Sequence, residues 1–230
     1  MRPGEILRES WDLYRAHARH LISIAAVVYV PLGVIAGLLV LIGWPGVILA
    51  NLLNIAAIFL VQGALVKAVE DLRDGRQDMG VAETFGYASH SLLPLAVAGV
   101  LAAAGILLGL ILLVVPGLVL LTWWLVVSPV IVLESRSVIA GFGRSRALVR
   151  GSAWPVFGVM VLTLVVLFAF SLVLGVIAMP LGDPLRPFIV AALGNSLAAP
   201  FAAVAWTLTY FQLRAIETAD TPPRVPVPVA

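Results

Sequence analysis

Polar side chains are rare within the long apolar stretches of this sequence, and four amides stand out there. Asn51, Asn54 and Gln62 fall in one stretch, and on a helix they project within roughly 80° of one another. Asn195 lies in the last apolar stretch and is a candidate partner for this polar stripe. Such amides could line a polar path or bind a headgroup, or they form interhelical hydrogen bonds of about 0.6–2 kcal/mol each. We favour the hydrogen bonds, and the polar path stays open.

A carboxylate followed by three guanidiniums forms a second candidate group. Glu134 ends an apolar stretch, and Arg144, Arg146 and Arg150 follow within about two to four helical turns. A carboxylate near several guanidiniums forms ion pairs that fix a loop, whereas arginines in excess hold lipid phosphates. Because three arginines outnumber one glutamate, the two roles are compatible, and we favour the ion pairs.

Residues suited to catalysis or metal binding are sparse. His17 and His20 lie three residues apart and His90 stands alone, whereas a metal site needs more ligands than such a pair supplies. The sequence has no cysteine, which excludes disulfides and thiolate chemistry. It also lacks a phosphate-binding loop and a nucleophile elbow. We therefore expect no catalytic residues, no metal and no cofactor.

The composition indicates that membrane-spanning helices position these groups. Of 230 residues, 62% are hydrophobic and 11% are charged, and the mean hydropathy is +1.10. Soluble domains have about a quarter of their residues charged. The formal net charge of +2 gives no reason to expect a nucleic-acid partner. Windows of about twenty residues predict six spans, and these are Leu21–Ile42, Val47–Ala68, Leu92–Val115, Leu118–Leu133, Val156–Ala178 and Phe188–Phe211.

Proline and glycine separate the spans within each pair. The predicted turns lie at Pro45 and Gly46, at Pro116 and Gly117, and within Met179–Pro184. Proline removes a helical donor and glycine permits a reversal, so each pair of spans is predicted to form a helical hairpin. The alternative, in which Pro116 only kinks one long helix, is disfavoured because residues 92–133 are too many for one span.

The basic residues predict the orientation. Thirteen of the fourteen fall on one side of the six-span topology, and only Arg186 falls on the other. By the positive-inside rule that side is cytoplasmic. We therefore expect a multi-pass protein of the cell inner membrane with both termini in the cytoplasm.

Short polar segments precede each predicted hairpin. Residues 1–20 predict an amphipathic helix in the headgroup region, with Pro3 at its start and Trp11 and Tyr14 at its polar–apolar boundary. Weaker amphipathic patterns occur at Met79–His90 and Val138–Gly151, which suggests an internal repeat. The prediction is an all-α polytopic membrane bundle. It comprises one integral membrane domain, 1–217, made of helix 1–20, hairpin 21–68, loop 69–91, hairpin 92–133, segment 134–155 and hairpin 156–212, and a disordered Pro-rich cytoplasmic tail, 218–230.

Two GxxxG patterns predict close helix packing. One is formed by Gly33 and Gly37 and the other by Gly105 and Gly109. Glycines four residues apart let two backbones approach closely. We favour packing within the bundle, and a homo-oligomer stays open.

Several motifs carry a family resemblance. They are GEILRESWDLYR at 4–15, VPGL at 115–118, SPVIVLE at 128–134 and GRSRALVRG at 143–151. They resemble an uncharacterised family of small prokaryotic membrane proteins that is labelled as similar to the membrane domain of glycerophosphoryl diester phosphodiesterase. The resemblance implies a six-helix membrane domain without an agreed molecular function. It does not imply phosphodiesterase activity, which belongs to a separate soluble domain in such proteins.

Function is predicted less sharply than architecture. We expect a non-enzymatic protein that organises membrane lipids, anionic ones in particular, or an unknown membrane or cytoplasmic protein, through its cytoplasmic face. The alternative is a transporter, channel or lipid-translocating protein that uses the polar stripe of the second span. A lipid-modifying enzyme is the least favoured class, because no acid, base or nucleophile is evident.

Overall fold

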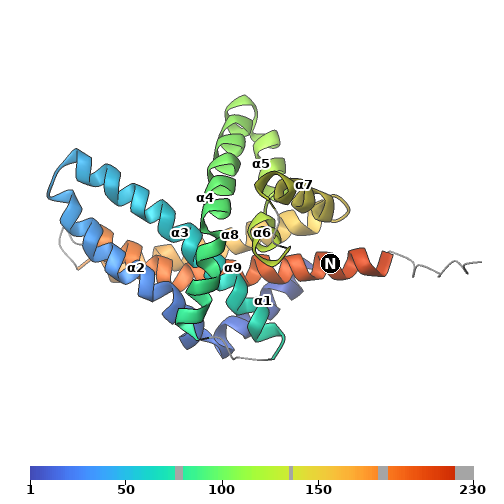
Figure 1. The fold of residues 1–230 in the computed structure, drawn as a ribbon, viewed down its shortest axis with the longest axis horizontal. Coiled ribbons are helices and arrows are strands. Elements are labelled where there is room, and N and C mark those ends of the chain that lie inside the picture. Colours follow the sequence, from blue (N-terminus) through green and yellow to red (C-terminus); the bar gives the residue numbers. More distant parts are fainter. Residues whose placement is uncertain (76–79, 135–136, 181–185, 221–230) are drawn as a thin grey trace, which may run out of the picture.

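The chain folds into helices, as a computed structural model shows (Figure 1). The structure describes residues 1–75, 80–134, 137–180 and 186–220, of which 90% are helical and none lies in a strand. The elements are α1 Pro3–Ala16, α2 Ala18–Val40, α3 Trp44–Arg73, α4 Val81–Leu112, α5 Val114–Trp123, α6 Val127–Glu134, α7 Val138–Val149, α8 Ala153–Ile177 and α9 Arg186–Asp220. With α5 and α6 taken together, six helical segments are long and apolar enough to cross a membrane. The predictions of an all-α fold and of six such segments are confirmed.

Three helices extend well beyond the predicted spans. Helices α3, α4 and α9 have 30, 32 and 35 residues, and at 1.5 Å per residue they exceed the roughly 30 Å of a hydrocarbon core. The short helix predicted at 79–90 is therefore not separate, because residues from Val81 onward form the first turns of α4. Residues 218–220, predicted to be disordered, are the last turn of α9, and residues 221–230 lie outside the described part.

The two predicted proline turns are displaced by a few residues. The chain reverses at Leu41–Gly43, where Gly43 has φ 83°, so Pro45 and Gly46 are already in the first turn of α3. The break after α4 falls at Leu113, whose backbone is extended, and Pro116 is the third residue of α5. Proline suits the first turn of a helix because no intrahelical acceptor awaits its missing N–H. Each proline thus marks the start of the next helix, and α4 and α5 pack against each other as two helices.

The predicted fourth span, 118–133, is broken in two. Helix α5 ends at Trp123 and α6 begins at Val127, with Leu125 and Val126 buried between them. The N–H of Val127 donates to the carbonyl of Trp124 across this break. The hydroxyl of Ser145, on α7, donates to the carbonyl oxygen of Trp123 over 2.7 Å. Protein groups therefore satisfy the backbone where the helix stops.

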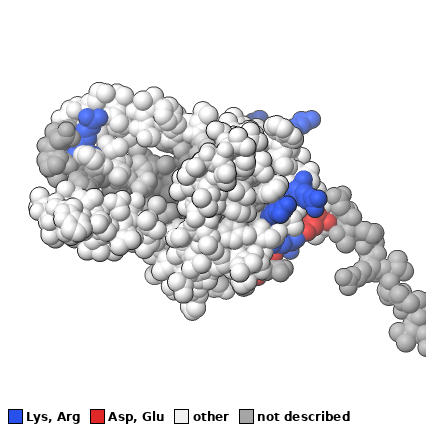
Figure 2. Space-filling view, turned by 90° about the horizontal axis from the view of Figure 1, so that it is seen from above, with Lys and Arg blue, Asp and Glu red and all other residues white. Residues whose placement is uncertain are grey.

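Helix α9 forms the centre of the molecule. It contacts α1, α2, α3, α6, α7 and α8, and in Figure 1 it runs horizontally across the ribbon while the α2–α3 and α4–α5 turns point away in different directions. Tyr14, predicted at the polar–apolar boundary, is instead buried, and its hydroxyl donates to the carbonyl of Leu197 on α9. Figure 2 shows a broad face free of charged side chains, with most of the visible charges gathered near the C-terminal end of α9.

The second GxxxG pattern lies against α5. A Cβ atom added to Gly109 would lie 3.0 Å from the backbone of Gly117, and one added to Gly105 would lie 2.8 Å from the ring of Trp124. A side chain at Gly105 would therefore force the Trp124 ring to shift, and one at Gly109 would be in unusually tight contact with the backbone of α5. Gly33 and Gly37 are half-buried on α2.

Replacing Gly109 with valine should lower the free energy of unfolding by about 1–3 kcal/mol, because the added carbons overlap the backbone of α5. The matched control is Gly175→Val on α8, where an added Cβ meets nothing within 4 Å. Unfolding of both variants in detergent micelles measures the difference. Equal stability would show that α4 and α5 do not depend on this close approach.

Candidate functional site

A cluster of ionic side chains joins α6, α7 and α9. The guanidinium of Arg144 lies between two carboxylates: its Nε is 3.2 Å from Oε2 of Glu134, and its Nη1 and Nη2 lie 2.5 and 2.6 Å from the two oxygens of Glu217. The fork of Arg144 thus binds Glu217 through two parallel hydrogen bonds, a geometry that lysine cannot provide. Of the ion pairs expected between Glu134 and Arg144, Arg146 and Arg150, the structure contains the one with Arg144. We call Glu134, Arg144, Tyr210 and Glu217 the Arg144 cluster.

Tyr210 completes the cluster from α9. Its hydroxyl donates to Oε1 of Glu134 over 3.1 Å, and Nη1 of Arg214 lies 3.4 Å from the same hydroxyl oxygen. Since Glu134 is only 11% exposed, its charge depends on these donors for the solvation that burial removes. The cluster therefore fixes the end of α6 to α7 and α9.

The environment keeps Arg144 protonated. Its hydrogen bonds to Glu217 raise the pKa of Arg144 above its ordinary value, burial opposes this, and the charge and hydrogen bond of Glu134 reinforce it. The group is therefore a permanent cation at every physiological pH.

The other two predicted arginines lie outside the cluster. The guanidinium carbon of Arg146 lies 4.3 Å from the ring centroid of Trp123, a cation–π contact. Arg150 is exposed where α7 ends. Among the described residues, neither arginine forms an ion pair. The structure thus separates Arg144, which ties helices together, from Arg146 and Arg150, whose charges face outward.

Tyr210 and Glu217 were not identified from the sequence. They lie seven residues apart with Arg214 between them, so on one helix they share a face. That spacing could have indicated a shared helix face. It was not used because the last span was predicted to end at Phe211, which left Arg214 and Glu217 outside the helix. Trp123 was also missed, because nothing in the sequence brings it to Arg146.

The predicted polar stripe is only partly assembled. Asn51, Asn54 and Asn195 line one cavity of about 370 Å³ between α2, α3 and α9, together with Tyr29 and Gly33. The amide of Asn51 also donates to the carbonyl of Val47, four residues earlier. We call this the amide cavity.

Gln62 does not line the amide cavity. It lies about two turns beyond Asn54 on α3, and its Nε2 is buried without a hydrogen-bond partner among the described residues. In the described part of the chain, no group of three or more His, Cys, Asp or Glu side chains could hold a metal ion.

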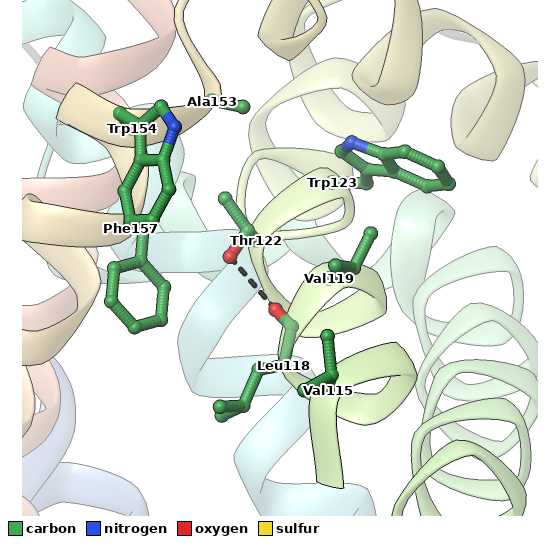
Figure 3. A pocket seen from close by; sticks show the side chains of 8 residues that line it. All are labelled: Val115, Leu118, Val119, Thr122, Trp123, Ala153, Trp154 and Phe157. Atoms are coloured by element: carbon green, nitrogen blue, oxygen red, sulfur yellow. Dashed lines mark hydrogen bonds between the residues drawn. The ribbon is translucent and has the colours of Figure 1, made fainter. Parts of the chain in front are cut away.

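A second cavity, of about 390 Å³, lies between α5 and α8 (Figure 3). Its walls are mainly apolar, and the hydroxyl of Thr122 donates to the carbonyl of Leu118 within α5. We call it the α5–α8 groove. Its lining side chains are Val115, Leu118, Val119, Thr122, Trp123, Ala153, Trp154 and Phe157.

The fold and these sites define a helical protein of the multi-pass membrane type. Comparison with protein-family models, curated proteins and solved structures finds no match to this chain. The family resemblance drawn from the four motifs therefore stays a prediction.

Replacing Arg144 with glutamine should lower the free energy of unfolding by about 2 kcal/mol, because it leaves the poorly exposed Glu134 short of a charged donor. Arg144→Lys should restore only part of the loss, since an ammonium cannot form the paired hydrogen bonds. Chemical denaturation in micelles measures both changes.

The matched control for this experiment is Arg150→Gln, which removes the same charge from an exposed position and should change stability by less than about 0.5 kcal/mol. If Arg144→Gln were as stable as this control, the cluster would have no structural role.

Proposed function

We propose that this protein is a non-enzymatic inner-membrane protein that organises anionic lipid, or a membrane partner, through its cytoplasmic face. One observation carries the proposal: Glu134 and Glu217 both engage Arg144, while Arg146 and Arg150 of the same segment are exposed. Carboxylates thus neutralise the arginine that holds the fold and leave the outer two to face the membrane surface. Each exposed arginine near anionic lipid contributes about 1 kcal/mol of attraction.

The proposed topology is three hairpins with α1 and α7 at the headgroup layer and both termini in the cytoplasm. Its support is the distribution of charge. All the described basic residues except Arg186 lie on or just before α1, at the start of α2, near the ends of α3 and α9, or on and just after α7. Helix α9 contacts α1, α3 and α7. The positive-inside rule assigns such a side to the cytoplasm. The family resemblance agrees with this topology and with a role other than catalysis.

Changing Arg146 and Arg150 together to glutamine should reduce the phosphatidylglycerol that co-purifies with the protein in native nanodiscs, relative to phosphatidylethanolamine. The reason is the loss of two exposed cations that are not held by carboxylates. Quantifying lipids by mass spectrometry measures the ratio against that of the surrounding membrane.

The matched control for the lipid experiment is Arg186→Gln, at the other end of the topology, which should leave the lipid ratio unchanged. An unchanged ratio in the double variant, with the fold intact, would overturn the lipid proposal.

The amide cavity favours a second candidate, a transporter or channel for a polar solute. Asn51, Asn54 and Asn195 come from two helices, yet they line a common space rather than only packing against each other. Their amides offer both donors and acceptors without net charge. Such a lining suits an uncharged polar solute or a partly hydrated ion.

Cysteine labelling tests this candidate cleanly, because the chain has no cysteine of its own. A membrane-impermeant maleimide applied from outside should modify Asn54→Cys if water reaches the amide cavity, since only a hydrated thiolate reacts. Val34→Cys, exposed on the apolar surface of α2, should stay unmodified in lipid.

Trp44→Cys, at the exposed α2–α3 end, should label from outside and serves as the positive control. If Trp44→Cys is labelled while Asn54→Cys is not, the amide cavity is not reached by water and the transporter or channel proposal is wrong. If Trp44→Cys labels only from the cytoplasmic side, the proposed orientation is wrong.

A further inference from the structure

The α5–α8 groove is apolar along its length and polar at one end. Val115 and Leu118 line one end, and Trp123 and Trp154 line the other (Figure 3). In Figure 3 the indole nitrogens of both tryptophans lie at this second end, toward Ala153. The hydroxyl of Thr122 is already bonded within α5. The donor hydrogen of Thr122 is thus already used, and the two indole N–H groups are the donors that the lining side chains offer at this end.

One cation lies beside this polar end, and a second is close to it along the chain. Arg146 lies over the ring of Trp123, and Arg150 is three residues before Ala153, which lines the groove. The Ser145 hydroxyl bond to the carbonyl of Trp123 holds α7 in this position. Indole and guanidinium groups are donors without acceptors. A ligand head here must therefore supply acceptors and negative charge.

We infer that the α5–α8 groove holds one acyl chain of an anionic phospholipid, whose phosphate binds Arg146 and Arg150 beside the two indoles. The inference rests on the proposed lipid-organising function. It adds where the lipid binds, which class of lipid it is and where its acyl chain lies. The nearby carboxylates, Glu134 and Glu217, are engaged by Arg144. A choline or ethanolamine headgroup would bring a further cation beside two arginines, so a phosphatidylglycerol-type headgroup fits best.

The apolar and charged ends of the groove contribute differently to the free energy of lipid binding. Moving an acyl chain from bilayer to groove changes little, because lipid tails are as apolar as the groove walls. Selectivity must therefore come from the charged end, where charge-assisted hydrogen bonds form. The groove fixes where the phosphate lies relative to the two arginines.

The test compares two valine substitutions in protein reconstituted with equal phosphatidylglycerol and phosphatidylcholine. Val119→Phe fills the groove, whereas the control Val165→Phe enlarges an exposed side chain of α8 outside its lining. Native mass spectrometry counts the bound phosphatidylglycerol. We expect about a fivefold loss in Val119→Phe, similar to the loss of one surface arginine contact, because a lipid whose chain is displaced no longer places its phosphate at both arginines. We expect no loss in Val165→Phe.

The outcomes separate this inference from the function on which it rests. If Arg146→Gln/Arg150→Gln loses phosphatidylglycerol while Val119→Phe retains it, the function stands and the groove is wrong. If Val119→Phe loses both lipids equally, the anionic specificity is wrong. If Val165→Phe loses as much as Val119→Phe, the effect is general packing and the groove is wrong. If neither the arginine nor the groove variant has an effect, both proposals fail.

A second measurement does not depend on tolerance of the bulky side chain. A photoreactive benzophenone residue at 119 should crosslink phosphatidylglycerol in excess of its share of the bilayer, whereas one at 165 should crosslink lipids in bulk proportion. Bulk proportions at both positions would overturn the inference.

Discussion

Within a bilayer, every backbone donor and acceptor must find its partner inside the protein, and this constraint shapes the whole molecule. It requires a helix to cross the apolar stretch without an uncovered break, as α3, α4 and α9 do. It also explains where a helix can stop. The break between α5 and α6 is covered by protein, and the hydroxyl of Ser145 reaches the carbonyl that the end of α5 exposes. Helix ends thus occur at a turn, or where another helix supplies a group.

The charged residues follow a related rule, because a buried charge needs a partner and an exposed one does not. Arg144 has two carboxylates and a fixed place, while Arg146 and Arg150 keep their charges at the surface. The same short segment therefore stabilises the fold through one arginine and, in the proposed function, presents the other two to lipid. The apolar α5–α8 groove lies beside Arg146. A phospholipid likewise has a charged headgroup next to an apolar chain, which is why we propose this place for one.

Apolar stretches predict the six long segments well because length and hydropathy act locally. Proline positions were harder to interpret: Pro45 and Pro116 suit both a turn and the first turn of a helix, and only the surrounding packing selects between them. An ion pair between Glu134 and one of the following arginines was predictable from proximity along the chain, but the sequence did not single out Arg144. Its partner Glu217 is 73 residues from Arg144, and no local pattern contains that information. The amide stripe separated for a similar reason, since the path of α9 decides which turns of α3 face a cavity.

The Arg144 cluster has a consequence for the order in which the helices assemble during synthesis. Ribosomes deliver the chain from the N-terminus, so α5 and α6 enter the membrane before Ser145 and Arg144 are available to them. Glu217 arrives last of all, near the end of α9. Ser145 and Arg144 reach the carbonyl of Trp123 and the carboxylate of Glu134 once α7 is made, whereas Tyr210, the second donor to Glu134, comes only with α9. The fourth membrane segment therefore matures only after synthesis of the sixth, which makes the C-terminal helix the step that completes assembly.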